Sequence, residues 1–188
     1  MALWLTNNPE ADALLDRDPL ALLIGMVLDQ QVPLEKAFSG PYELRQRLGR
    51  DLAAKDLAEV DEDTLVDLFS RQPALHRFPG AMAQRVQALA RQVVEEYDGD
   101  AARVWTEAAS GADLLKRLQA LPGFGKQKAQ IFLALLGKQL GVRPEGWREA
   151  AGTFGEDGVY RSVADIVDAD SLGEVRMYKK QQKAAHKK

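Results

Sequence analysis

Hydrophobic residues in this chain recur mainly at the three- and four-residue spacing that places them on one face of an α-helix. No run of alternating β-branched residues between hairpin turns appears, so the pattern predicts an all-α protein. The segment from Pro19 to Asp29 is apolar all round, which predicts a buried, central helix. Asp18 and Pro19 supply the N-cap and the first turn of that helix.

Prolines, glycines and capping residues mark the other helices. Pro33 is expected to begin a short helix towards Phe38, and Gly40-Pro41 a separate helix to Leu48. Further helices are expected at 62–70 with Asp61 as the cap, and at 79–97, 101–108, 112–120, 125–138 and 171–185, with a looser segment at 141–158.

Two of these helices are joined by Leu-Pro-Gly-Phe-Gly-Lys-Gln-Lys-Ala, residues 121–129. Pro122 fixes the entry to the turn, and Gly123 and Gly125 allow a positive φ and a close backbone approach. The backbone N–H groups that open the second helix have no helical partner. Together with the positive end of the helix dipole and with Lys126 and Lys128, they form an anion site.

The anion is expected to be a DNA phosphate. The spacing of a Walker phosphate loop and the strand that precedes one are both missing, which argues against a nucleotide. A helix–hairpin–helix arrangement is typical of binding to the DNA backbone without sequence preference. An ordinary turn between two packed helices is the alternative.

Composition narrows the classes of protein and site. The chain has 188 residues, no cysteine and two histidines, which argues against disulfides, iron–sulfur clusters and thiolate or histidine metal sites. No apolar run reaches membrane-spanning length and no signal peptide is evident, so we expect a cytoplasmic protein without membrane contact, acting as a monomer.

Charge is unevenly distributed. Residues 1–75 carry 14 acids against 7 Lys and Arg, whereas residues 76–188 carry 14 acids against 18. A basic C-terminal half can hold a phosphate backbone even though the net charge is −3. The lysines of the tail, from Lys179 to Lys188, are more typical of a solvated end than of a DNA contact.

With these residues the chain resembles the helix–hairpin–helix/Gly-Pro-Asp superfamily of base-excision DNA glycosylases. The hairpin at 121–129 matches almost residue for residue. Leu28-Asp29-Gln30-Gln31, the segment Phe78–Gly99 and the loop Gly141–Pro144 also match in order, so that the resemblance covers about residues 18–147.

The resemblance implies a catalytic carboxylate after the hairpin, where the family has an aspartate. Glu145, twenty residues after Gly125, takes that position, with Asp157 as the second choice; a plain surface role for Glu145 is the alternative. A carboxylate stabilises the oxocarbenium-like sugar of glycosidic cleavage or activates water. Where bifunctional relatives place a Schiff-base lysine this chain has Gln127, which predicts a glycosylase without lyase activity.

The resemblance assigns further positions. Gln31 would fill the gap that an extruded nucleotide leaves, and Phe78 would be a wedge between neighbouring bases; a polar helix end and a core residue are the alternatives. Gln30 and Trp147 are candidates for lining the pocket. The carbonyls of Gln119, Leu121 and Phe124 would hold Na⁺ or K⁺ at the hairpin, while no other cofactor, and no iron–sulfur cluster, is expected.

We therefore expect two helical lobes with double-stranded, lesion-containing DNA in the cleft between them. A six-helix domain at 20–138 carries the hairpin, and residues 1–19 and 139–188 form the second lobe. The function predicted is a monofunctional DNA N-glycosylase of base excision repair. The alternatives are a catalytically inactive DNA-binding protein with Glu in place of the family Asp, and a helical interaction protein with no DNA activity.

Overall fold

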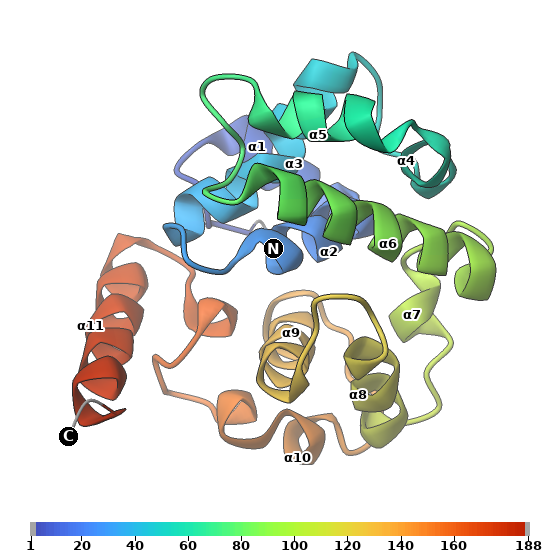
Figure 1. Ribbon diagram of the computed structural model, residues 1–188. Helices are drawn as coiled ribbons and strands as arrows, with labels where there is room; N and C mark the ends of the chain where they lie inside the picture. The colour runs from blue at the N-terminus through green and yellow to red at the C-terminus, as the bar shows by residue number, and fades with distance from the viewer. Residues whose placement is uncertain (1–2, 187–188) are drawn as a thin grey trace.

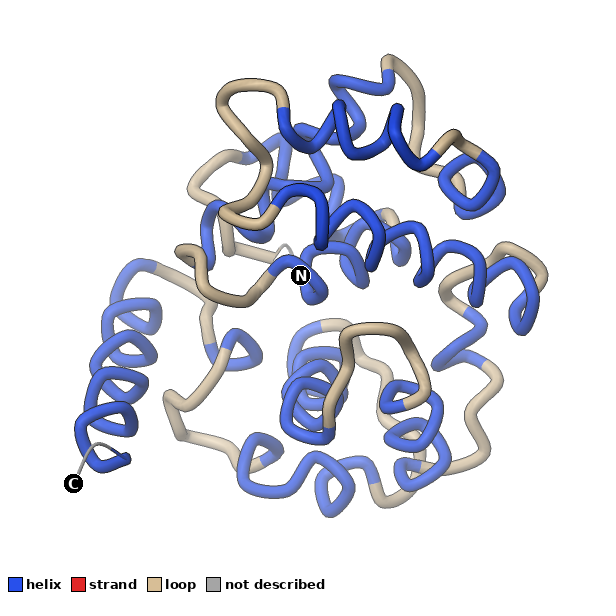
Figure 2. Tube along the Cα trace, viewed as in Figure 1, coloured by secondary structure: helices blue, strands red, loops and turns tan. Residues whose placement is uncertain are grey.

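The computed structural model describes residues 3–186 and is helical, with no strand in that range (Figure 2). The all-α prediction is confirmed. The α-helices are α1 (Pro9–Arg17), α2 (Pro19–Leu28), α3 (Leu34–Leu48), α4 (Ala54–Glu59), α5 (Glu62–Ser70), α6 (Pro79–Tyr97), α7 (Arg103–Thr106), α8 (Gly111–Gln119), α9 (Lys126–Gln139), α10 (Trp147–Ala151) and α11 (Ala169–His186). Two short 3-10 helices, η1 (Gly152–Gly155) and η2 (Val163–Asp165), follow α10.

The helices gather in two groups (Figure 1). Helices α1 to α6 form the upper group, α8 to α10 form the lower one, and α7 lies between them at one edge. Every residue from Leu20 to Leu28 is buried, so α2 is the central helix that its apolar sequence predicts. Helix α9 is the corresponding centre of the lower group, where α8, α10 and both 3-10 helices pack around it.

The N-terminal helix lies with the upper group. Helix α1 packs on α2 and α3, whereas the segment after α9 packs on α8 and α9. Residues 1–19 were expected to share a lobe with residues 139–188, and the packing of α1 differs from that expectation. Leu14 and Leu15 explain it, because α1 buries these side chains in the core that it shares with α2.

Residues 34–48 form one helix rather than the two that were predicted. Pro41 lies inside α3, where its ring removes one backbone donor from the helix. The packing of buried residues on both sides of it, Phe38 and Leu44, keeps the helix continuous. The predicted break at Gly40-Pro41 is therefore wrong, because tertiary burial outweighs the local preference of proline.

Most other boundaries agree with the predicted caps. The Asp61 carboxylate accepts a hydrogen bond from the Thr64 amide at the start of α5. Asp98 ends α6 in the left-handed conformation, with φ +54°. Helices α1, α4 and α10 were not expected; they have nine, six and five residues, too few for a clear periodic signal.

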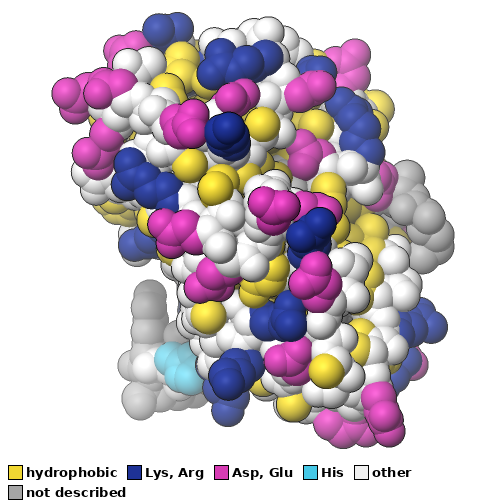
Figure 3. All heavy atoms as spheres, turned by 90° about the vertical axis from the view of Figure 1, so that its right-hand side faces the viewer, with side chains coloured by type: hydrophobic (Ala, Val, Ile, Leu, Met, Phe, Trp, Pro, Cys, Tyr) yellow, Lys and Arg dark blue, Asp and Glu magenta, His cyan; other side chains and the backbone are white. Residues whose placement is uncertain are grey.

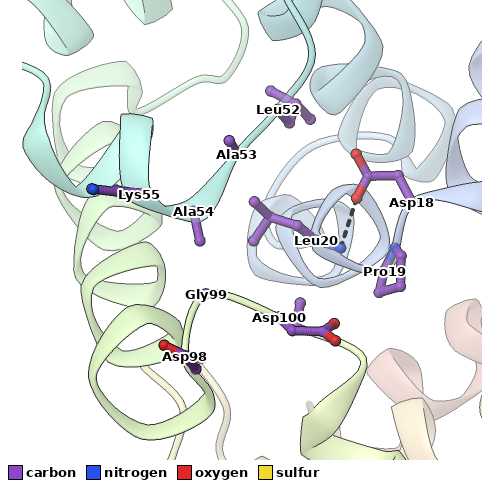
Figure 4. A pocket seen from close by; sticks show the side chains of 11 residues that line it. Asp18, Pro19, Leu20, Leu52, Ala53, Ala54, Lys55, Asp98, Gly99 and Asp100 are labelled. Atoms are coloured by element: carbon purple, nitrogen blue, oxygen red, sulfur yellow. Dashed lines mark hydrogen bonds between the residues drawn. The ribbon is translucent and has the colours of Figure 1, made fainter.

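A pocket of about 420 Å³ lies between the start of α2, the start of α4 and the end of α6 (Figure 4). Asp18, Lys55, Asp98 and Asp100 contribute its polar side chains, and Asp18 is engaged as the N-cap of α2. The pocket is at the opposite end of α2 from Asp29. Within the described residues no helix is both long and apolar enough to cross a membrane.

Candidate nucleic-acid interface

The predicted hairpin forms between α8 and α9. The Phe124 amide donates to the Leu121 carbonyl over 3.1 Å, which closes the turn, and the Phe124 ring packs on Phe132 in α9. Gly123 has φ +85°, and a Cβ there would lie 2.9 Å from Cδ of Arg85. Glycine is required at 123 for both reasons, and the turn is docked on α6.

The amides that open α9 are available to a ligand. Gly125 is the N-cap residue and no side chain caps this helix start. Gly125, Lys126 and Gln127 are exposed, and a Cβ built on Gly125 would meet nothing within 4 Å. Open backbone N–H groups at the positive end of a helix, next to an exposed lysine, are the surroundings that an oxygen anion prefers.

Lys128 points away from this opening, back to the end of α2. Its Nζ donates to the Met26 carbonyl over 2.6 Å and to the Asp29 carbonyl over 3.3 Å. Burial lowers the pKa of Lys128, and the charge of Asp29 opposes that shift. The Lys128 ammonium therefore caps the C-terminal end of α2 and connects α9 to α2. The Lys128 side chain is thus not available at the hairpin opening, where this residue can offer only its backbone amide.

His76 makes a second connection to the end of α2. Its Nε2 lies 3.1 Å from the Leu28 carbonyl and 3.0 Å from the Gln30 carbonyl, while its Nδ1 accepts from the Phe78 amide over 3.0 Å. Because Nδ1 accepts, the proton of the neutral ring is on Nε2. Burial lowers the pKa of His76, against the effect of the two carbonyls. The ring thus joins the loop after α2 to the loop before α6.

Gln30 completes this junction. Its side-chain amide donates to the Val27 carbonyl over 2.9 Å, and its oxygen accepts from Arg85 over 3.2 Å. The carbonyls of Met26, Val27 and Leu28 at the end of α2 are therefore each met by a side chain, and those of Met26 and Leu28 also accept the amides of Asp29 and Gln30. The Gln30 side chain therefore links the end of α2 to α6. The sequence had instead suggested that Gln30 lines the pocket.

Gln31 and Phe78 lie on the two loops that His76 joins. Gln31 is exposed and has φ +55°, a left-handed conformation that is uncommon outside glycine. The Phe78 side chain is 41% exposed, with the Arg77 guanidinium 5.3 Å from its ring centroid. The core alternative for Phe78 is wrong, and both side chains are free to meet a partner.

Glu145 is not brought to the hairpin turn. Its carbonyl accepts from the Gly111 amide over 2.7 Å, at the N-terminal end of α8. The turn lies at the other end of α8, which has nine residues and is thus ~12 Å long. Asp157 is exposed and pairs with Arg148 over 3.0 Å, and the hydrogen bond from Arg148 lowers the pKa of Asp157.

Trp147 belongs to the core, which corrects its assignment to the pocket. It is 9% exposed and its ring lies on Gly137, where a Cβ would come within 2.4 Å. Arg148 and Arg143 flank the ring at 4.6 and 5.9 Å from its centroid. The indole fills the space between α10 and α9, so it is not open to a base.

Of the three carbonyls predicted to hold a monovalent cation, that of Leu121 accepts the Phe124 amide and keeps one lone pair. The turn would hold an ion through Gln119, Leu121 and Phe124, which would add a positive charge beside the open amides. Within residues 3–186 no cluster of three or more His, Cys, Asp or Glu side chains could hold a metal.

The side of the molecule at the right of Figure 1 is unsuited to a phosphate backbone. Figure 3 shows acidic and basic side chains interspersed on that side, with no extended area of one sign. Exposed cations near the hairpin, His76 and Asp29 include Lys126, Lys36, Lys179 and Arg77. A nucleic acid would therefore be expected on the hairpin side.

Comparison with known proteins identifies the family of this chain. Residues 24–187 match the model of the HhH-GPD superfamily base excision DNA repair protein. The chain belongs to this superfamily. No curated protein and no solved structure matched the chain. The match begins within α2, at residue 24, and includes the hairpin, so the HhH-GPD family relationship extends over both loops that His76 joins.

Sequence reasoning missed His76, Arg85 and the carboxylate of Asp29. His76 and Arg85 act through contacts across 48 and 55 residues of chain, for which the sequence contains no local signal. Asp29 stands within the quoted Leu28–Gln31 motif, so it could have been considered, but nothing in its spacing distinguishes it from a helix-end acid.

Proposed function

We propose that this protein is a DNA N-glycosylase of base excision repair that has no lyase activity. It would bind lesion-containing duplex DNA through the amides that open α9, turn one nucleotide out of the duplex and hydrolyse its N-glycosidic bond. The observation that carries the proposal is the uncapped, exposed helix start of Gly125, in a chain of the HhH-GPD superfamily.

The loops at Gln31 and Phe78 support the base-turning step. A nucleotide leaves a gap in the duplex when it is extruded, at a cost of a few kcal/mol. An exposed amide and an exposed aromatic ring are suited to filling the gap and separating the neighbouring bases. Because His76 holds both loops, they would enter the duplex as one unit.

The absence of lyase activity rests on the lysines near the hairpin. Gln127 cannot form an imine, and the Nζ of Lys128 is directed away from the hairpin opening, to the Met26 and Asp29 carbonyls at the end of α2. Lys126 is exposed and on the side of α9 away from Lys128 by ~160°, since two residues advance a helix by about 200°. Base removal would therefore leave an intact abasic strand.

The test uses duplexes that carry uracil, hypoxanthine, alkylated or oxidised bases. Base release followed by cleavage only after alkali supports the proposal, and cleavage without alkali contradicts the lack of lyase activity. Borohydride should trap no covalent protein–DNA adduct. Glu145→Gln and Asp157→Asn belong in the same assay because these acids are the carboxylates that the sequence predicts.

A second candidate is DNA binding without chemistry. The position of Glu145 at the far end of α8 favours it, since the family carboxylate is then not delivered to the hairpin. In that case the protein would bind duplex DNA with a salt-dependent affinity and release no base from any of the duplexes. The same assay separates the two functions.

A further inference from the structure

The carboxylate of Asp29 is partly buried at the end of α2, yet no described residue donates a hydrogen bond to it or pairs with it. Every fully buried side-chain polar atom among the described residues has a partner, so the unpartnered Asp29 oxygens retain access to the surface. Burial raises the pKa of Asp29, and Lys179 and Lys128 oppose that shift. An acid kept in surroundings that disfavour its charge is typical of a functional site.

The position of Asp29 is fixed by contacts to its backbone. Its carbonyl accepts from Lys128, which belongs to the first turn of α9, directly after the open amides. Gln31, the exposed residue with positive φ, is two residues further along the chain. Asp29 thus lies between the hairpin helix and the loop proposed to enter the duplex, where neither Glu145 nor Asp157 lies.

The two lysines near Asp29 come from different elements. Lys128 approaches from α9 and Lys179 from α11, the helix at the left of Figure 1. Both lysines favour the ionised carboxylate, which stabilises a positively charged sugar, and the partial burial of Asp29 reduces the screening of its charge by water. A carboxylate near the hairpin would be expected to act on the nucleotide whose phosphate the hairpin holds.

We propose that Asp29, rather than Glu145, is the catalytic carboxylate that faces the sugar of the extruded nucleotide. This inference rests on the proposed function. The bond between C1′ and the base nitrogen breaks, and its electron pair leaves with the base, which takes a proton from solvent. Asp29 stabilises the positive charge at C1′ and accepts a proton from the water whose oxygen forms the new bond to C1′.

The experiment compares Asp29→Asn with Asp98→Asn in single-turnover base release. Both changes remove one negative charge with little change in shape, and Asp98 is exposed at the end of α6, where Asn also accepts a positive φ. We expect Asp29→Asn to lose ~10²–10⁴-fold in rate, with duplex binding unchanged or tighter. Asp98→Asn should stay within about twofold of the wild-type rate.

Chemical rescue and thermal stability distinguish catalysis from a structural role. Formate should restore part of the rate of Asp29→Gly by supplying a carboxylate, which a merely structural aspartate would not allow. The melting temperature of Asp29→Asn should equal or exceed that of the wild type, because its buried charge is removed.

Three results would overturn this inference alone: full activity in Asp29→Asn, unfolding of that variant, or a rate loss confined to Glu145→Gln. A wild-type protein that releases no base from any lesion duplex would instead overturn the proposed function, and this inference with it.

Discussion

The hairpin contact is tested most directly by Gly125→Ala. Gly125 has φ −78° and ψ 179°, an extended conformation that alanine adopts without strain, and a Cβ there meets nothing within 4 Å. The folded protein should therefore keep its stability or gain ~0.4–1 kcal/mol, because alanine restricts the unfolded chain more than glycine does. The added methyl would occupy the open space through which a phosphate must approach the amides.

The expected loss of affinity follows from the hydrogen bonds that the methyl displaces. One hydrogen bond to a charged group contributes ~1.5–3 kcal/mol. Its loss corresponds to a dissociation constant that is roughly 10- to 150-fold larger at 25 °C. Fluorescence anisotropy with a short duplex at several salt concentrations measures this loss, and thermal unfolding measures stability. Lys126→Glu provides a comparison, since it should reduce the salt dependence of binding by at least one phosphate contact.

Two outcomes would refute this account of the hairpin. Unchanged duplex affinity in Gly125→Ala would show that the amides opening α9 do not contact the phosphate. A lower melting temperature together with weaker binding would show that the methyl disturbs the turn itself. That result would contradict the free space around Gly125, where a Cβ meets nothing within 4 Å.

Other parts of the site lead to further predictions. Gly123→Ala should lower stability by ~1–2 kcal/mol from the positive φ alone, more if Arg85 is displaced, and Gly137→Ala by ~1–3 kcal/mol from overpacking against Trp147; urea unfolding checks both. Phe78→Ala should change stability little, because the ring is exposed, yet slow base release. The lowered pKa of His76 means that the unfolded chain binds its proton more readily, so stability present above pH 6.5 should be lost as the pH falls. His76→Gln should weaken that pH dependence in thermal unfolding; an identical pH profile would contradict it.

The local features of the fold were largely predictable from the sequence. Asp18-Pro19 and the apolar run after it define α2, and Leu121–Ala129 defines the turn, because capping and hairpin chemistry act over a few residues. The continuity of α3 through Pro41 was not predictable, since it depends on what the helix packs against. Capping and turn preferences predict the structure of a segment only where they outweigh the segment's tertiary packing.

The site itself was predictable in part. Exposure of the hairpin start and of Phe78 agrees with the expected roles, whereas Trp147 is a core residue and Glu145 lies at the other end of α8. Spacing along the chain locates a loop but not the direction of a side chain. The contacts at the end of α2 come from residues up to 102 positions away, so no window of sequence contains them.

The side-chain capping of α2 bears on the order in which the protein folds. The turn between α8 and α9 closes over a few residues and can form early, but its anchor, Lys128, needs carbonyls that are about one hundred residues upstream. Closing a loop of that length is slow compared with forming a local turn. A nascent or truncated chain that carries the hairpin alone would thus present the amides without the surface that orients them, and DNA affinity should arise only when the whole chain has folded.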